Sequence, residues 1–286
     1  MNQLEVLAAG LRFGEGPRWH SGTLWFSDMY DHAVKTVDLR GNVVVKVEVP
    51  GQPSGLGWLP NGDLLVVLMQ ERQVLRLDHD RFVIHADLSS VATWHCNDMV
   101  VDADGRAYVG NFGFDLHSAE TAGDFTTAAP APLALVQPNG AVSVAADELM
   151  FPNGTVITPD GRTLIVAESM GRRLTAFDRA ADGTLSNRRV WADLGRRIPD
   201  GICLDAEGCI WVADAAAPEC IRVAEGGRVL EVLATDRNAF ACMLGGPEGR
   251  HLFVLTSLHS HPERCVASRD AQVLVTTVAV PHAGRP

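Results

Sequence analysis

A phrase that recurs along the sequence places oxygen-bearing side chains at equivalent positions in four of its copies. These residues are Glu15, Asn97, Asn153 and Asp200. Asn and Asp often begin strands after turns, but all four stand at the same phase of the repeat, which favours a shared role. Two carboxylates and two amide oxygens form a hard-oxygen set that suits Ca²⁺, or Mg²⁺ or Mn²⁺ with more bound water. A zinc site would more often contain Cys or His.

Each copy of the phrase reads as a β-hairpin. The copies SGLGWLPNGDLLVV, NDMVVDADGRAYVG, NGTVITPDGRTLIVA and DGICLDAEGCIWVA begin at Ser54, Asn97, Asn153 and Asp200. In all four a turn glycine follows eight residues after the first residue, between two short runs rich in Val, Leu, Ile and Trp. Asn-Gly, Asp-Gly and Glu-Gly between such runs are typical of tight hairpin turns. Two weaker copies begin at Glu15 and Ala241.

Two more strand-like runs follow each hairpin, which gives six units of four strands. The spacing of about 45 residues matches the period of propeller blades, and no helical period persists over ten residues. We therefore predict an all-β, six-bladed β-propeller of antiparallel strands, with a single domain spanning residues 1–286. A large β-sandwich is the alternative. The last unit supplies only three runs, so 3–8 at the N-terminus is expected to complete it and close the ring.

The first strand of a propeller blade is innermost, so the four oxygen-bearing residues should meet near the axis. Four motifs around these residues are similar to those of a known protein family. They are EGPRW at Glu15, ND at Asn97, FPNG at Asn153 and PDG at Asp200. The chain resembles the gluconolactonase, regucalcin and luciferin-regenerating-enzyme family over nearly its whole length. The resemblance implies that these four residues bind a divalent cation, usually calcium or zinc, and that the protein hydrolyses lactones or related esters.

One position departs from the family pattern. Members of the gluconolactonase type often carry an Arg two residues before the Asn ligand, where it contacts a sugar substrate, and this chain has His95 there. The change argues against specificity for sugar lactones. The imidazole could act as a general base or donate to an oxyanion, or it could simply pack at the pocket wall.

Loops between the second and third strands return to the face where the first strands begin. This places Met29, Tyr30, Phe112 and His259 near the pocket mouth as candidate substrate contacts, although the apolar ones could equally cap the core. His259 and His261 alternate in sequence, so both could face the pocket. The longest of these loops, 112–132, is either a lid that selects the substrate or a surface loop.

Hydrolysis would use the cation to polarise a carbonyl, with Asp200 or His95 taking a proton from the attacking water. Three alternatives keep the fold and the metal: non-hydrolytic carbonyl chemistry (enolisation, isomerisation or a lyase reaction), phosphotriester hydrolysis, and a non-catalytic calcium-binding propeller. The sequence contains no GxSxG elbow and no phosphate-binding loop, which disfavours a serine hydrolase or a nucleotide enzyme.

The charge and residue composition of the chain argue against some classes of binding partner. The formal net charge is −11, with 35 Asp and Glu against 24 Lys and Arg, which argues against nucleic acid or an anionic membrane. The longest apolar run, 64–69, is too short to span a bilayer. The N-terminus does not read as a secretory signal, and the six cysteines show no CxxC pair, so we expect reduced thiols and a cytoplasmic location. The expected partner is a small-molecule substrate; the oligomeric state stays open.

Overall fold

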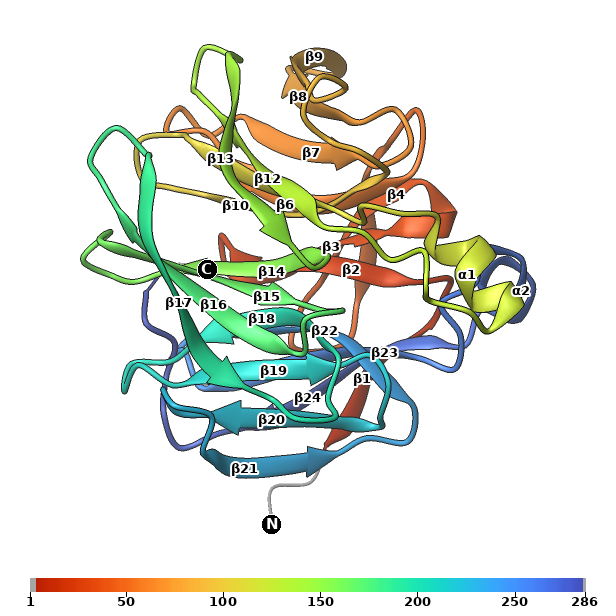
Figure 1. Ribbon diagram of the computed structural model, residues 1–286. Coiled ribbons are helices and arrows are strands. Elements are labelled where there is room, and N and C mark those ends of the chain that lie inside the picture. The colour runs from red at the N-terminus through yellow and green to blue at the C-terminus, as the bar shows by residue number, and fades with distance from the viewer. Residues whose placement is uncertain (1–3, 285–286) are drawn as a thin grey trace.

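Six four-stranded antiparallel sheets surround one axis in the structure, a computed structural model that describes residues 4–284. The sheets are arranged like the blades of a propeller (Figure 1). The predicted six-bladed β-propeller is confirmed.

The first three blades follow the order of the chain from the axis outward. Blade one contains β2 (Gly14–His20), β3 (Thr23–Asp28), β4 (Ala33–Val37) and β5 (Val43–Glu48). Blade two contains β6 (Pro53–Trp58), β7 (Leu64–Leu68), β8 (Gln73–Asp78) and β9 (Arg81–Asp87). Blade three contains β10 (Cys96–Val101), β11 (Ala107–Asn111), β12 (Ala131–Val136) and β13 (Val142–Leu149).

The next blades repeat this arrangement, and the last one joins the two ends of the chain. Blade four contains β14 (Pro152–Ile157), β15 (Thr163–Glu168), β16 (Arg173–Arg179) and β17 (Leu185–Asp193). Blade five contains β18 (Pro199–Leu204), β19 (Ile210–Asp214), β20 (Glu219–Val223) and β21 (Val229–Ala234). Blade six contains β22 (Asn238–Gly245), β23 (His251–Ser257), β24 (Ala271–Thr277) and β1 (Glu5–Leu11).

The N-terminal strand closes the ring as predicted. Strand β1 pairs antiparallel with β24, with Glu5 opposite Val275 and Leu11 opposite Ala271. Gln3, the first residue of the predicted strand, lies outside the described residues. This pairing holds the first and last strands of the chain in one sheet, with β1 as the outer strand of blade six.

Glycines next to the site positions let the inner strands approach one another closely. A Cβ atom on Gly55 would lie 2.4 Å from the backbone nitrogen of Met99, and one on Gly154 would lie 2.5 Å from the backbone oxygen of Asp200. Only a residue without a side chain fits such contacts. In the copies that carry it, the glycine after the first residue therefore lets neighbouring first strands approach closely at the axis.

Apolar side chains fill the spaces between the blades. One such cluster joins blades two and three and includes Val67, Cys96 and Val109. Cys96 thus points into the core, away from the side chain of its neighbour Asn97, as the alternation of a strand requires. All six cysteines are buried and unpaired.

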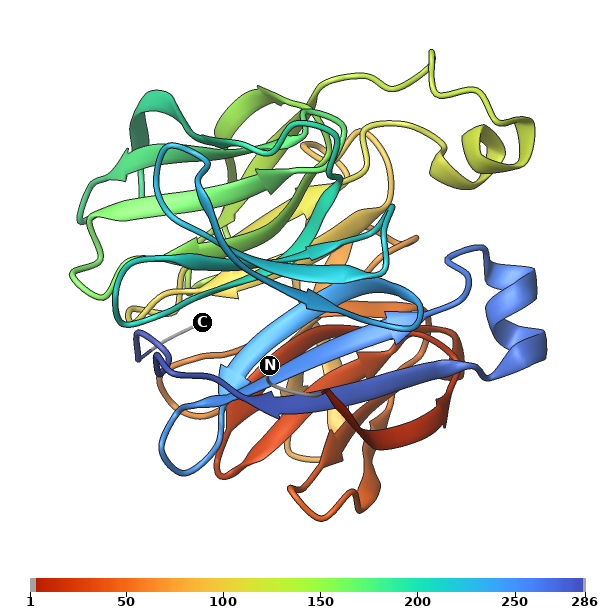
Figure 2. The same cartoon turned by 90° about the horizontal axis from the view of Figure 1, so that it is seen from below.

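Short helices gather at one end of the propeller. They are the 3₁₀ helix η1 (Met29–Asp31), α1 (Leu116–Ala122) and α2 (Pro262–Ser268). The last two lie at the same end in both ribbon views (Figure 2). Within residues 4–284, no helix is long and apolar enough to cross a membrane.

Helix α1 lies in the long loop of blade three, where the sequence predicts no helix. The carboxylate of Asp115 accepts a hydrogen bond from the backbone nitrogen of Ser118 at 3.0 Å, which caps the first turn. Gly123 ends the helix in the left-handed conformation, at a φ of 64°. These two signals, an Asp three residues before a Ser and a glycine after the last turn, are typical helix boundaries. A helix of seven residues is too short to show a periodic apolar pattern.

Candidate active site

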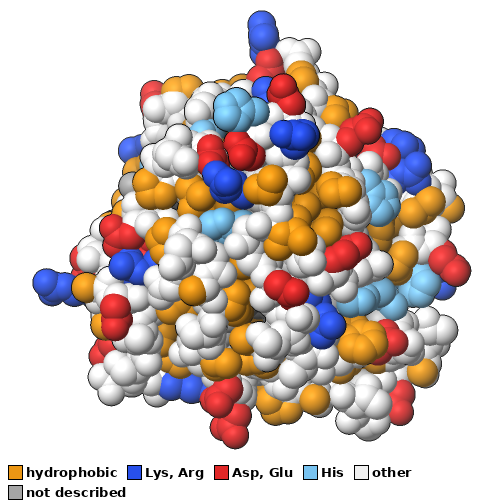
Figure 3. Space-filling view, turned by 90° about the horizontal axis from the view of Figure 1, so that it is seen from above, with side chains coloured by type: hydrophobic (Ala, Val, Ile, Leu, Met, Phe, Trp, Pro, Cys, Tyr) orange, Lys and Arg blue, Asp and Glu red, His pale blue; other side chains and the backbone are white. Residues whose placement is uncertain are grey.

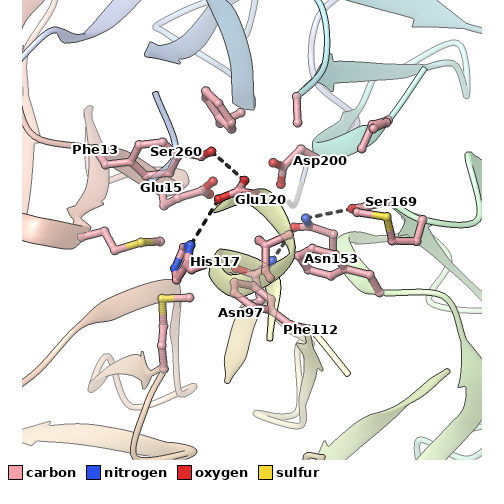
Figure 4. Close-up of a pocket in the computed structure, with 18 of the residues that line it drawn as sticks. Phe13, Glu15, Asn97, Phe112, His117, Glu120, Asn153, Ser169, Asp200 and Ser260 are labelled. Carbon is pink, nitrogen blue, oxygen red and sulfur yellow. Dashed lines mark hydrogen bonds and ion pairs between the residues drawn. The ribbon is translucent and has the colours of Figure 1, made fainter. Parts of the chain in front are cut away.

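The four oxygen-bearing residues of the sequence phrase line one cavity of about 230 Å³. Glu15, Asn97, Asn153 and Asp200 are each the second residue of an inner strand, and all four side chains are buried. Figure 4 shows them converging near the axis of the propeller. Because each residue occupies the same position in its inner strand, residues far apart in the sequence meet at one point.

A chain of hydrogen bonds orients the two amides. Asn97 Nδ2 donates to Asn153 Oδ1 at 2.8 Å, and Asn153 Nδ2 donates to Ser169 Oγ at 3.1 Å. The Ser169 hydroxyl in turn donates to the backbone oxygen of Pro199 at 2.7 Å. Because the Pro199 carbonyl can only accept, Ser169 must accept from Asn153. The Asn153 amide is therefore held with its nitrogen toward Ser169 and its oxygen toward Asn97.

The two carboxylates carry strongly perturbed proton affinities. Burial raises the pKa of Glu15 well above its usual range, and the nearby carboxylates of Asp200 and Asp98 raise it further. Burial also raises the pKa of Asp200, and Asp98 adds to that effect. Two buried carboxylates this close disfavour each other's charge. A cation between them would remove that penalty.

The donor set fits a hard divalent cation. Residues 4–284 contain no group of three or more His, Cys, Asp and Glu side chains arranged to hold a metal ion. A cation at this site would therefore take amide oxygens from Asn97 and Asn153 as well as carboxylate oxygens from Glu15 and Asp200. That combination is typical of calcium sites and compatible with magnesium or manganese.

The walls of the cavity are largely apolar and come from loops of several blades. Met29 and Tyr30 line it from blade one, Phe112 from blade three and Met170 from blade four, while Phe240 lines it from the start of β22. Met29, Tyr30 and Phe112 are predicted substrate contacts, and the structure places all three at the cavity. Whether they touch a substrate stays a prediction.

Helix α1 covers the mouth of the cavity and is attached to the loop that precedes α2. The Ser260 hydroxyl donates to Glu120 Oε1 at 2.9 Å, and His117 Nδ1 lies 3.3 Å from Glu120 Oε2. Thr121 Oγ1 lies 3.3 Å from His261 Nε2. In Figure 4, His117 and Glu120 are seen over the middle of the ring, on the coil of α1. Segment 112–132 therefore forms a lid, one of the two roles predicted for it.

His95 lies beside the cavity wall and directly precedes β10. Its ring stacks on Trp94 at 5.2 Å and lies 6.2 Å from Phe112, which itself lines the cavity. His95 is not among the described residues that line the cavity. Its role as a base or an oxyanion donor stays a prediction.

His259 and His261 line a groove next to the cavity, and Ser260 between them lines both the groove and the cavity. Contact of His259 with a substrate stays a prediction. The loop holds Ser260 by its backbone oxygen, which accepts a hydrogen bond from the Tyr30 hydroxyl at 2.9 Å. If side chains alternate along this loop, either Ser260 or its two histidine neighbours face the cavity. In the structure, Ser260 lines the cavity.

Sequence reasoning missed several residues of the site. His117 and Glu120 reach the cavity only because α1 folds over it, and Ser169 only because it follows β15 opposite Asn153. Phe13 and Phe151 each lie two residues before a predicted site residue, Glu15 and Asn153 respectively. Their nearness in sequence to these site residues could have predicted that the two phenylalanines line the cavity.

The sequence of this chain is similar to those of proteins of a known family. A sequence model described as "SMP-30/Gluconolactonase/LRE-like region" matches residues 13–258. The chain belongs to this family. Among the family relatives it is similar to regucalcin of Xenopus laevis, with 26% identity over 261 residues that cover 88% of this chain and 85% of the relative. Human regucalcin is also 26% identical, over 257 residues that cover 87% of this chain and 84% of the relative.

Solved structures of family members share the fold. The luciferin-regenerating enzyme superposes with a TM-score of 0.81 at 18% identity, covering 99% of this chain and 97% of that one. A calcium-binding protein, regucalcin, from Agrobacterium tumefaciens gives a TM-score of 0.80 at 21% identity and covers 98% and 95% of the two chains. A gluconolactonase from Xanthomonas campestris gives 0.75 at 23%, covering 98% and 90%.

The surface gives no sign of a broad positive field on the face that Figure 3 shows. Acidic and basic side chains are interspersed there with scattered hydrophobic ones. Such a mixed face lacks the continuous basic patch by which proteins commonly bind nucleic acid.

Proposed function

We propose that this protein is a divalent-cation-dependent hydrolase that opens lactones, with Ca²⁺ as the preferred ion. The observation that carries the proposal is the pair of buried carboxylates, Glu15 and Asp200, which meet two amides on the floor of a lidded apolar cavity. Family membership and the names of relatives, which include a gluconolactonase and a calcium-binding regucalcin, support it.

Glu15, Asn97, Asn153 and Asp200 would hold the cation. When bound, the cation supplies charge compensation for the carboxylates and Lewis-acid polarisation of the substrate carbonyl. Ser169 contributes by fixing the amide of Asn153, so that less reorganisation is needed when the site is filled.

Asp200 is the proposed general base. Its carboxylate lies on the floor of the cavity with the other proposed ligands, so it is already positioned to take a proton from a water bound there. The water oxygen forms a bond to the lactone carbonyl carbon as its proton passes to Asp200. The ring C–O bond then breaks, and the proton passes from Asp200 to the departing ring oxygen, which gives one hydroxy acid for each lactone and water consumed.

The lid and the apolar wall serve the same reaction by limiting bulk water. Leu116 on α1 and Phe125 in the following loop line the cavity from the lid side. Excluding bulk water strengthens the interaction of the floor carboxylates with any charge that develops beside them.

Replacing Asp200 by Asn tests the assignment of the base. Asp200→Asn is expected to keep the fold and lose at least 99% of lactone turnover, because general-base catalysis contributes about 10²–10⁴-fold. Turnover is measured as proton release in a pH-stat with added Ca²⁺. Asp147→Asn, an exposed change of the same type, is the control and should retain full activity. Near-complete activity of Asp200→Asn would overturn the role of this base.

The product distinguishes the remaining chemistries. A hydroxy acid that is one water heavier than the lactone supports hydrolysis, whereas a product of unchanged mass would indicate enolisation or isomerisation of a carbonyl. Ca²⁺ binding without turnover of any lactone or phosphotriester would indicate a calcium-binding role.

A further inference from the structure

We infer that the substrate is a lactone with an alkyl or aryl substituent, and not a polyhydroxylated sugar lactone. The inference rests on the proposed function for the reacting ring and goes beyond it in assigning what the rest of the cavity accepts. Two independent features lead to it: the composition of the wall, and the state of the polar groups that interrupt the wall.

The wall is one continuous hydrophobic cluster rather than a set of scattered apolar contacts. The ring of Phe13 packs at a tilt against that of Phe240 with centroids 4.8 Å apart, and Phe112 packs in the same way against Phe151 at 4.6 Å. All four are buried members of a single cluster that also contains Met29, separate from the clusters between the blades. Figure 4 places Phe13 and Phe112 on different sides of the floor carboxylates. A bound molecule would therefore meet aromatic rings on more than one side.

No lysine or arginine is among the described residues that line the cavity. His95 is not among those lining residues either. The cavity thus lacks the cationic side chain that would anchor a hydroxylated substrate by charge-assisted hydrogen bonds.

The polar groups of the wall are already hydrogen-bonded within the protein. The Tyr30 hydroxyl donates to the backbone oxygen of Ser260 at 2.9 Å, and Gln52 Oε1 accepts from Gln70 at 2.9 Å. On the lid side, Glu120 accepts from the Ser260 hydroxyl at 2.9 Å and pairs with His117 at 3.3 Å. These bonds hold the lid and the wall in place.

The same holds near the floor. The Ser169 hydroxyl accepts from Asn153 and donates to Pro199. What remains for a ligand is the cluster of Glu15, Asp200 and the two amides, which the cation and the lactone carbonyl would occupy. A substituent hydroxyl would meet mainly apolar side chains on the wall, where the hydroxyl protons of Tyr30, Ser260 and Ser169 are already donated within the protein.

Such a wall should favour substrates with alkyl substituents over substrates with hydroxyl substituents. Each hydroxyl moved from water to an apolar wall without a partner opposes binding, while each methylene moved there favours it. Because a polyol lactone carries several hydroxyls, the two terms act in the same direction. We therefore expect kcat/KM for an alkyl δ-lactone to exceed that for glucono-δ-lactone by at least tenfold.

The test compares δ-decalactone, dihydrocoumarin and glucono-δ-lactone in a pH-stat with Ca²⁺ present and spontaneous hydrolysis subtracted. Preference for the first two supports the inference. Equal or higher kcat/KM for glucono-δ-lactone overturns it while leaving lactone hydrolysis intact.

A matched pair of variants assigns the preference to the wall. Met170→Ser adds a hydroxyl to the wall and is expected to lower kcat/KM for δ-decalactone about tenfold, with little change for glucono-δ-lactone. Met150→Ser is the control, because Met150 is also half-buried but does not line the cavity. Equal losses for both lactones in Met170→Ser would contradict a wall that selects apolar substituents.

Binding of inert analogues separates failure of the inference from failure of the proposed function. Calorimetry with the pentyl-substituted δ-lactam and with gluconolactam needs no turnover. Tighter binding of the alkyl lactam supports the inference even if no lactone is hydrolysed, in which case only the hydrolytic proposal fails. Tighter binding of gluconolactam, or binding of neither lactam, overturns the inference.

Discussion

Arg18 of β2 donates to Asp98 of β10 across 3.1 Å, and this ion pair joins blade one to blade three behind the candidate active site. Both side chains are buried, and the same guanidinium also donates to the backbone oxygens of Pro17 and Met99. Asp98 replaces the glycine that follows the site residue in three other blades. The pair therefore satisfies a carboxylate that the blade geometry brings next to Glu15.

Removing the cation of this pair should destabilise the propeller. Arg18→Met leaves Asp98 buried and unpaired, which we expect to lower the free energy of unfolding by about 3–5 kcal/mol. Thermal unfolding followed by circular dichroism measures the loss. Arg189→Met removes an exposed arginine from its 2.7 Å pair with Asp178 and should leave the melting temperature nearly unchanged, because water screens exposed ion pairs. Equal melting temperatures for the two variants would contradict a structural role for Arg18.

Ser169 offers a test of the hydrogen-bond chain that orients the amides. Ser169→Ala frees Asn153 Nδ2, so the amide can rotate, and we expect the affinity for Ca²⁺ to fall about 10–100-fold. Calorimetric titration of the chelator-treated protein with Ca²⁺ measures the change. Ser143→Ala, in an exposed position of β13, is the control. Unchanged affinity in Ser169→Ala would show that the amide is held by other means.

Close packing of the inner strands predicts a coupled loss of stability and binding at Gly154. A Cβ atom there would lie 2.5 Å from the backbone oxygen of Asp200. Gly154→Ala should therefore push blades four and five apart, with a cost of about 1–3 kcal/mol and loss of Ca²⁺ binding. Gly10→Ala has open space around the new Cβ atom and strains only its own backbone, so it should leave binding intact. Normal Ca²⁺ affinity in Gly154→Ala would show that Ca²⁺ binding does not depend on the close approach of blades four and five.

The lid is expected to loosen in acid through Glu120. Burial opposes ionisation of this carboxylate, but its bonds to His117 and Ser260 dominate, so its pKa is lowered. The stabilisation they give is complete above the ordinary pKa of a free glutamate and is lost as the pH falls through the lower pKa of the attached lid. His117 and His261 face the same carboxylate and contribute to this lowering.

Hydrogen-exchange protection factors for 116–122 measure this effect, because they correct for the intrinsic pH dependence of exchange. We expect protection to be steady from pH 7 to about pH 5 and to fall below it. Glu120→Gln should lower it about tenfold at pH 7, matching roughly 1.5 kcal/mol for a hydrogen bond to a charged group. Glu263→Gln in α2 is the control. Protection that is insensitive to Glu120→Gln would contradict this attachment of the lid.

The inner strands are the part of the molecule that the sequence predicts best. Their phrase repeats because each blade needs the same close packing at the axis, so one comparison of copies predicts both the fold and the convergence of Glu15 and Asp200. The closing strand is predicted for a related reason, since the last unit lacks one strand and the N-terminus can supply it.

Contacts between loops of different blades are not predictable in this way. His259 was assigned by extending strand alternation into a loop and His95 by its place in a family pattern, and neither is among the described residues that line the cavity. The attachment of Glu120 to Ser260 joins residues 140 positions apart, with no repeat to relate them. Arg18 could be recognised as part of a motif, but nothing in the sequence indicates that it reaches Asp98.

Dependence of hydrolysis on the cation tests the central proposal most directly. Chelator-treated protein is titrated with Ca²⁺ while proton release from δ-decalactone or dihydrocoumarin is recorded in a pH-stat, and binding is measured by calorimetry on the same sample. The proposal predicts no turnover without the cation, and an activity curve whose midpoint matches the binding midpoint in the wild type. In Asn153→Ala both midpoints should shift together to higher Ca²⁺. Turnover that persists unchanged in the chelated protein would contradict the proposal.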